Sequence, residues 1–414
     1  MVQKTIVDDA YFVKTRSAVI WTSILSEPLW TAYSFLVIIL YKDLNATLLQ
    51  ISIFTTLKPV VGILSMYWSF SIRNRRDKLR SNVVWAGILG RLPFFLFPFV
   101  NGPWVVIIGG AFYMMLKRGE LPAWMEILKL NMPKKRREKV FSLSSAFAYA
   151  EGIIITIGMG MLLDKNVQAW RFLFPLSALI GIGAVLIQSK LKVNGITESI
   201  PQQDSCRESI KERFVAPWKQ AFKLVKERSD FRSFQWGFML GGFALMIIMP
   251  ALPIFFVDIL GISYTDLAIA VGICKAAGFV ISSQVWARML NKTGIFRITG
   301  LINVMFGMFF VCLIMSQHNM VWFYIAYFLY GVAQGGSHLS WSLSGPIFSR
   351  DEDSSMYSSV NVLMVGVRGC VGPPLGAVMC LLLGPMPLLF FAATISYCVG
   401  IKMWRRSKSV VFAE

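Results

Sequence analysis

The chain has 414 residues, of which 56% are hydrophobic and 15% are charged, and its formal net charge is +19. A soluble globular protein carries about 25% charged residues, so this composition excludes a water-soluble globular domain of the usual kind. The excess of Lys and Arg does not indicate nucleic-acid binding, because these residues concentrate in every second gap between long apolar segments, as in proteins that are oriented in a membrane.

The apolar segments have the length that a membrane crossing requires. A helix needs about 20 mainly apolar residues to cross a hydrocarbon core of roughly 30 Å, and lipid cannot satisfy the backbone of any open, non-helical segment. We therefore predict an all-α integral membrane protein with about twelve transmembrane helices. The segments cover residues 17–40, 47–70, 82–100, 103–126, 140–163, 170–189, 232–257, 263–289, 297–316, 320–345, 356–383 and 385–404.

The basic residues in the gaps predict how the chain is oriented. One set of gaps, together with the two ends of the chain, holds 31 Lys and Arg, whereas the alternate gaps hold two, Lys42 and Lys165. Cytoplasmic loops carry the excess of basic residues, so we expect both termini to be cytoplasmic in a cell (inner) membrane. The first apolar segment is too long for the core of a cleaved signal peptide.

A long polar segment divides the apolar ones into two sets of six. Its second part is amphipathic, because Phe214, Trp218 and Phe222 recur at helical spacing among basic residues. We expect a helix at the cytoplasmic headgroups that tethers the two halves. The predicted domains are a six-helix bundle at 1–190, a linker with an amphipathic helix at 191–230, and a second six-helix bundle at 231–414.

The two halves show traces of an internal repeat. A shift of 217 residues aligns Lys58 with Lys275, Trp124 with Trp341, and Glu151 with Arg368. Transporter folds are often built from such repeats. We therefore predict two pseudo-symmetric bundles.

Short motifs add a family resemblance. Segment 71–80, between the second and third apolar segments, places Asp77 among basic residues. Segment 286–297, between the eighth and ninth, contains Gly294 and basic residues. The sixth apolar segment begins with Trp170, Arg171 and Phe172. With six helices on each side of a long connector, the chain resembles the major facilitator superfamily of transporters. The resemblance implies a monomeric secondary transporter in which two halves rock around a solute site near the midplane.

Charged residues within the apolar segments are candidates for that site. Burying one costs at least about 2.5–3.5 kcal/mol, so such residues usually face a cavity or a partner. The predicted cavity residues are Lys58, Glu151, Lys275, Arg368, Asn361, His338 and Gln334. Helix packing, structural ion pairs and a hydrogen-bonded structural histidine stay open as alternatives.

Other charged residues suggest proton coupling and gating. A carboxyl group in dry surroundings can exchange protons near neutral pH, which makes Glu27 and Glu151 the candidates for coupling to H⁺. For the gate we predict Asp77 and Arg76, in the gap after the second segment, and Arg118 and Glu120, toward the cytoplasmic end of the fourth.

The sequence predicts a transporter rather than an enzyme. It contains two His, scattered Cys and no phosphate-binding Gly-x4-Gly-Lys-Ser/Thr loop, so we expect no metal site, no cofactor and no ATP-driven pumping. Central cations outnumber central anions by one, which favours an anionic or zwitterionic small-molecule solute. The alternatives are a lipid or drug flippase or exporter of the same fold, and a transporter-like sensor that does not transport.

Overall fold

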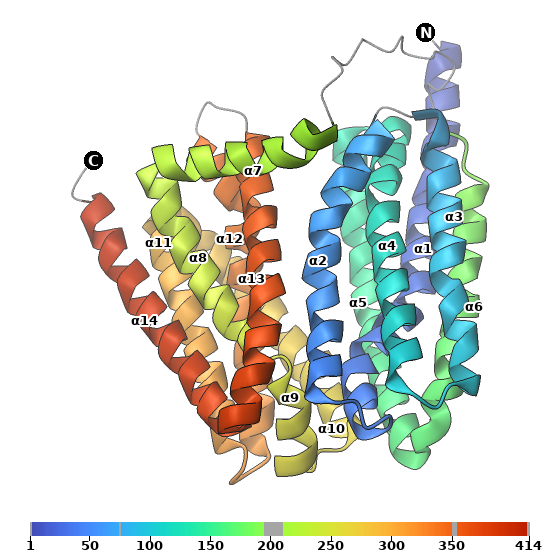
Figure 1. Ribbon diagram of the computed structural model, residues 1–414. Coiled ribbons are helices and arrows are strands. Elements are labelled where there is room, and N and C mark those ends of the chain that lie inside the picture. The colour runs from blue at the N-terminus through green and yellow to red at the C-terminus, as the bar shows by residue number, and fades with distance from the viewer. Residues whose placement is uncertain (1, 74–75, 194–209, 350–353, 412–414) are drawn as a thin grey trace. The chain divides into compact units, whose positions relative to one another are not determined.

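The computed structural model describes residues 2–73, 76–193, 210–349 and 354–411, which form helices joined by short loops, without a strand among them (Figure 1). Helices satisfy their own backbone hydrogen bonds, which is the condition for crossing lipid. The predicted all-helical membrane fold is confirmed.

The first half of the chain forms long helices whose ends match the predicted segments to within several residues, apart from long extensions of α1 and α5. Proline residues turn the third crossing from an α-helix into a 3₁₀ helix after Arg91. The elements are α1 (Val2–Lys42), α2 (Leu48–Arg73), η1 (Arg76–Lys78), α3 (Leu79–Arg91), η2 (Leu92–Phe99), α4 (Pro103–Asn131), α5 (Lys134–Lys165), η3 (Val167–Ala169) and α6 (Trp170–Ser189).

The second half begins with the predicted amphipathic helix, which ends at Glu227. Two π-helical turns interrupt the crossings that follow it. The elements are α7 (Ile210–Glu227), α8 (Ser229–Ile247), α9 (Ala251–Ile254), η4 (Phe255–Ile259), α10 (Tyr264–Ile269), η5 (Ala270–Cys274), α11 (Lys275–Met315), α12 (Val321–Ser349), α13 (Ser354–Leu383) and α14 (Pro385–Val411).

Length and apolarity identify fewer crossings than twelve. Among the described residues, seven helices are long and apolar enough to span a membrane, or eight if the bent pair formed by α8 and the 251–259 segment counts as one span. Helix α4 falls short because it carries Lys117, Arg118 and Glu120, and α12 because it is rich in Tyr, Gly and Ser. The exact number of twelve stays a prediction.

One of the seven spans is long enough to cross twice. The run Tyr264–Met315 contains 52 residues, or about 78 Å at 1.5 Å per residue, more than twice the hydrocarbon thickness. Gly294 interrupts it with φ 77° and ψ 166°, in a region that residues with a Cβ rarely adopt. This break lies in the predicted gap between the eighth and ninth segments.

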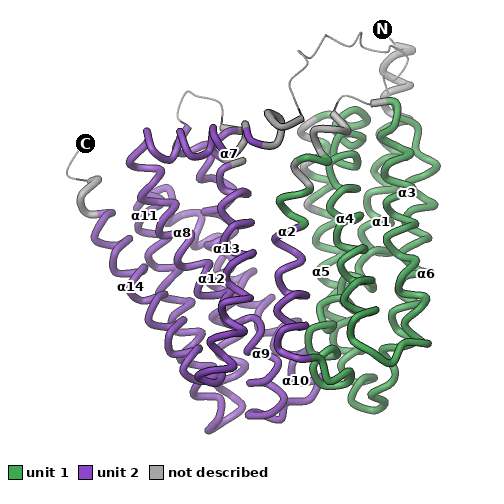
Figure 2. Tube along the Cα trace, viewed as in Figure 1, with its two compact units in different colours: residues 1–46, 61–207 green, residues 47–60, 208–414 purple. Residues whose placement is uncertain are grey.

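The chain divides into two compact units (Figure 2). Unit 1 contains residues 1–46 and 61–207, and unit 2 contains residues 47–60 and 208–414. The first part of α2 therefore groups with the second unit, and the predicted boundaries at 190 and 231 stay predictions.

Unit 1 is built around α1, which packs against α5 and α6, while α3 packs against α4 and α6. Its core has an apolar cluster that includes Val83, Trp124 and Leu128, and a group of stacked aromatic rings that includes Phe94 and Phe174, with centroids 5.6 Å apart. Close packing of large apolar side chains is the main source of this unit's cohesion.

Unit 2 is held together by α11, which packs against α12 and α14, and by α8, which packs against α13 and α14. Helices α11 and α12 approach so closely that a Cβ on Gly331 would lie 2.0 Å from the carbonyl oxygen of Lys275. Small residues permit such close helix contacts in membranes.

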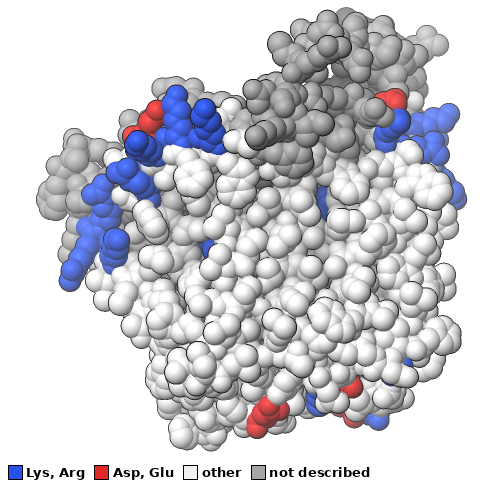
Figure 3. Space-filling view, viewed as in Figure 1, with Lys and Arg blue, Asp and Glu red and all other residues white. Residues whose placement is uncertain are grey.

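The surface supports insertion in lipid. Large apolar side chains are exposed along the helices, among them Ile154, Phe172, Val280 and Leu382, far more than a soluble monomer tolerates. In Figure 3 a wide uncharged face is visible, and the basic residues of α7 and α14 gather at one end of unit 2. On α7 the side chains of Lys219, Lys223 and Phe222 are exposed, as an interfacial helix requires.

Candidate functional site

The two candidate proton-coupling residues lie close together in unit 1. Glu27 on α1 and Glu151 on α5 interact electrostatically, and Glu27 also interacts with the Thr31 hydroxyl. Gly152 makes the approach possible, because a Cβ at this position would lie 2.8 Å from Oε1 of Glu27. Oε2 of Glu151 is buried and has no hydrogen-bond partner among the described residues. The helices thus bring two carboxyl groups into one space that offers them few donors.

An arginine near Glu27 is almost completely buried. Arg91 is 2% exposed, and its guanidinium donates to the carbonyl oxygen of Gly87 at 2.7 Å and to Oγ of Ser26 at 3.5 Å. A Cβ on Gly181 of α6 would lie 2.6 Å from its Nε. Arg91 therefore occupies a slot formed by glycines and contacts the residue before Glu27. The sequence signal that could have identified it is an arginine within an apolar segment.

The gate residues whose side chains are described have different surroundings. Glu120 is 3% exposed and pairs with Lys117 of its own helix at 3.2 Å, and it accepts from Gln188 of α6 at 3.4 Å. Arg118 forms no ion pair with another described residue, and Asp77 is exposed in η1. The Arg76 side chain lies outside the described side chains. The gate therefore stays a prediction.

Two of the predicted cavity lysines meet in unit 2. Lys275 begins α11 directly after a π-helical turn, and its Nζ lies 5.3 Å from the centre of the Tyr330 ring on α12. Lys58 of α2 is exposed and interacts electrostatically with Lys275. Like charges repel each other, and an anion bound by both would lower that repulsion. The two lysines that the repeat aligns in sequence thus lie within electrostatic range of each other.

Three further predicted cavity residues have different surroundings. Asn361 is buried; its Oδ1 accepts from Gln235 of α8, and its Nδ2 donates to Ser344 of α12 at 2.7 Å. Its amide therefore links three helices, as a structural residue does. His338 is exposed, with its ring 6.4 Å from that of Phe279, and Gln334 is half-buried. Their role in a cavity stays a prediction.

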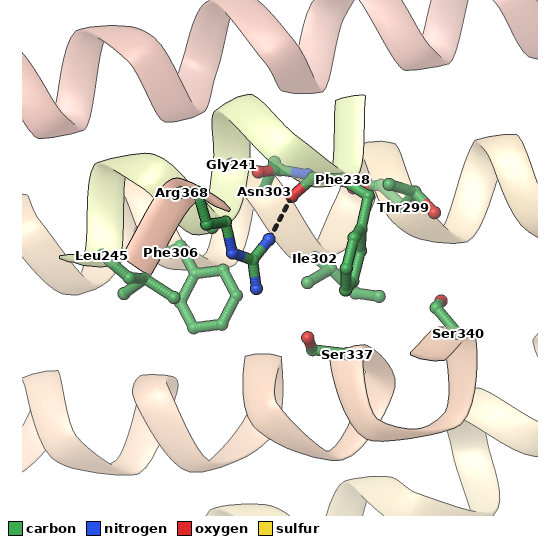
Figure 4. A pocket seen from close by; sticks show the side chains of 11 residues that line it. Phe238, Gly241, Leu245, Thr299, Ile302, Asn303, Phe306, Ser337, Ser340 and Arg368 are labelled. Atoms are coloured by element: carbon green, nitrogen blue, oxygen red, sulfur yellow. Dashed lines mark hydrogen bonds between the residues drawn. The ribbon is translucent and has the colours of Figure 1, made fainter. Parts of the chain in front are cut away.

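The last predicted cavity residue, Arg368, points into a pocket within unit 2. Its Nη1 donates to the carbonyl oxygen of Phe238 at 2.6 Å, and its guanidinium lies 4.7 Å from the centre of the Phe238 ring. The pocket has a volume of about 40 Å³. Figure 4 shows Arg368, Ser337 and Ser340 turned toward this space.

The structure offers no conventional metal centre in the parts of the chain that it describes. Residues 2–73, 76–193, 210–349 and 354–411 contain no group of three His, Cys, Asp or Glu close enough to hold an ion.

Known structures share this arrangement of helices. A structure of the nucleoside transporter NupG is similar with a TM-score of 0.65 and 13% identity, over 94% of this chain and 98% of that one. A transporter of the POT family in complex with 5-aminolevulinic acid gives a TM-score of 0.71 at 10% identity, over 96% of both chains. A bacterial homologue of the human lysosomal transporter Spinster, in an inward-facing and unoccupied conformation, gives 0.63 at 14% identity, over 95% and 98%.

Sequence comparison identifies a family but no individual curated relative. A search of curated proteins found no match. The family model described as Major Facilitator Superfamily matches residues 20–373, which is most of the chain. The chain therefore belongs to the major facilitator superfamily, and it is a multi-pass membrane transporter rather than an enzyme.

Proposed function

We propose that this transporter moves a small anionic or zwitterionic solute by alternating access, with protons as the coupling ion. Its place would be a cell (inner) membrane, with both termini in the cytoplasm, as the distribution of Lys and Arg predicts. The observation that carries the choice of solute is the proximity of Lys58 and Lys275.

The lysine pair favours an anionic group for electrostatic reasons. Both side chains are cationic in water, and the Tyr330 ring contributes a cation–π contact to Lys275 but no negative charge. A carboxylate or phosphate that binds both ammonium groups removes their repulsion and forms charge-assisted hydrogen bonds. Neutral solutes such as sugars cannot lower this repulsion or form charge-assisted hydrogen bonds of this kind.

A ligand-stabilisation screen tests the solute class. Purified protein is heated with amino acids, organic phosphates, nucleosides and sugars, and the unfolding midpoint is recorded. A ligand at 100 times its Kd stabilises the folded state by about 2.7 kcal/mol. We expect anionic or zwitterionic solutes to raise the unfolding midpoint of wild type. Lys58→Gln and Lys275→Gln should lose this stabilisation. Lys402→Gln, at an exposed lysine of α14, is the control and should retain it. Equal stabilisation of all these variants by a neutral sugar would contradict the proposal.

Proton coupling is assigned to Glu27 and Glu151. Two neighbouring carboxyl groups in a space with few donors are most stable when one of them carries a proton. A change in solute charge nearby alters that preference. Loss of the ability to titrate should therefore uncouple transport without removing it.

An imposed pH gradient across proteoliposomes tests the coupling. We expect wild type to accumulate the solute identified by the screen, and Glu27→Gln or Glu151→Gln to lose accumulation while still exchanging labelled for unlabelled solute. Glu227→Gln, at the exposed end of α7, is the matched control and should behave like wild type. Accumulation by wild type that ignores the gradient would refute coupling and leave transport itself intact.

A further inference from the structure

The pocket at Arg368 contains buried polar atoms with no partner. It lies between α8, α11, α12 and α13, and its lining includes Arg368, Asn303, Ser337 and Ser340 (Figure 4). Nε of Arg368, Oδ1 of Asn303 and Oγ of Ser340 are buried, and none of them has a hydrogen-bond partner among the described residues. Asn303 is 4% and Ser340 2% exposed. Because buried polar atoms are nearly always satisfied, three such atoms on residues that line one cavity indicate a bound species.

The charge of the pocket indicates that this species is an anion. Arg368 forms no salt bridge with any residue that the structure describes, and the pocket lining contains no carboxylate. Its contacts with Phe238 satisfy one N–H and one face of the guanidinium but leave the positive charge without a counter-charge. Arg368 is half-buried, and a cation withdrawn from water is more stable when it is paired.

The volume of the pocket limits the size of that anion. One water molecule needs about 10–15 Å³ in this measure, so a volume of about 40 Å³ holds on the order of three water-sized groups. A whole nucleotide, peptide or sugar phosphate does not fit inside this volume. A single monoatomic anion with one or two water molecules does.

We propose that this pocket binds a compact monovalent inorganic anion, with chloride as its cellular occupant. The Arg368 guanidinium and the hydroxyls of Ser337 and Ser340 donate to the anion, and a neighbouring water molecule donates to Oδ1 of Asn303. Every unpartnered atom is then satisfied, and the charge of Arg368 is balanced inside the helix bundle. Water without an anion would satisfy Asn303 and Ser340 but leave the guanidinium uncompensated.

The anion site is separate from the proposed solute site, because its lining includes neither Lys58 nor Lys275. Its predicted role is structural: the anion holds α13 against α8, α11 and α12. The proposal can therefore fail while the proposed transport function stands, and the reverse also holds.

Anion-specific thermal stability tests the proposal. Purified protein is heated in sodium chloride, bromide, formate or gluconate at one ionic strength. We expect the midpoint to rise with the logarithm of chloride or bromide concentration, and gluconate to have no such effect because it is too large. Stabilisation by gluconate equal to that by chloride would overturn the proposal. Formate that stabilises more than chloride would also overturn it, because the pocket would then suit the carboxylate end of an organic solute.

Variants assign the effect to the pocket. We expect Ser340→Ala to shift the chloride dependence to about tenfold higher concentration, as the loss of one hydrogen bond to an ion predicts, and Arg368→Gln to abolish it. Ser316→Ala is the matched control, since Ser316 is a buried serine of unit 2 whose hydroxyl donates to the carbonyl oxygen of Leu313. A wild-type chloride response in Ser340→Ala would contradict the assignment.

Bromide diffraction provides a test that does not depend on the Arg368 variant folding. Crystals of the wild-type protein soaked in bromide should show an anomalous peak between Arg368 and the hydroxyls of Ser337 and Ser340. A pocket without a peak, or occupied by water, would overturn the proposal.

Discussion

Gly152 offers the sharpest test of the carboxylate pair, because the same helix provides its control. A Cβ at Gly152 would lie 2.8 Å from Oε1 of Glu27, whereas a Cβ at Gly158 of α5 meets no atom within 4 Å. Replacing a glycine in a helix interior by alanine stabilises the helix by up to about 1 kcal/mol. Gly158→Ala should therefore be slightly stabilising.

The expected result for Gly152→Ala follows from the flexibility of its neighbour. The Glu27 carboxylate lies roughly 0.6 Å inside ordinary contact distance from the added methyl group, and a long side chain can rotate away at a cost of about 0.5–1.5 kcal/mol. The gain in helix propensity roughly offsets this cost, so the variant should fold. The carboxylate, however, is displaced from the neighbourhood of Glu151.

Both variants are assayed by uptake into proteoliposomes with and without an imposed pH gradient. We expect Gly158→Ala to accumulate solute like wild type and Gly152→Ala to lose most gradient-driven accumulation while retaining exchange. If the two alanine variants show the same dependence on the gradient, the positioning of Glu27 by Gly152 has no part in coupling.

Other substitutions test the packing, the buried ion pair and the lysine pair. Gly331→Ala should prevent α11 and α12 from packing, because its Cβ would lie 2.0 Å from a backbone oxygen. Size-exclusion chromatography should then show aggregated protein. The control Gly62→Ala, whose Cβ meets nothing within 4 Å, should elute like wild type. Lys117→Ala should destabilise the folded state by about 3–5 kcal/mol, because it leaves the charge of Glu120 buried and uncompensated. Replacing the exposed Lys129, the partner of Glu126, should cost less than about 1 kcal/mol. Equal unfolding midpoints of the two variants would contradict this prediction. Lys275→Met should weaken the binding of an anionic solute by at least tenfold in isothermal titration, and unchanged affinity would exclude this lysine from the solute site.

The fold was predictable because its signal is local. Each apolar segment had to be a helix in lipid, and the helices begin and end close to the predicted residues, with α1 and α5 running further. The sequence also placed the break between the eighth and ninth segments, where Gly294 lies. It could not show that the first part of α2 groups with unit 2, because that depends on contacts between residues far apart in the chain.

The sequence identifies candidate site residues but not how they are arranged, and their roles stay predictions. Charges within apolar segments identified Lys58, Lys275, Glu27 and Glu151, since each is costly in lipid. Their pairing depends on how the helices pack, and a glycine at position 152 has no recognisable signal of its role. Asn361 was also predicted as a cavity residue, and in the structure its buried amide forms hydrogen bonds with two neighbouring helices.

Solute accumulation by the purified protein tests the proposed function most directly. In sealed proteoliposomes with an inward proton gradient, the account predicts uptake of an anionic or zwitterionic solute above its external concentration, and a protonophore should abolish that accumulation. Uptake no greater than in protein-free liposomes, for every solute that stabilises the protein, would contradict the account.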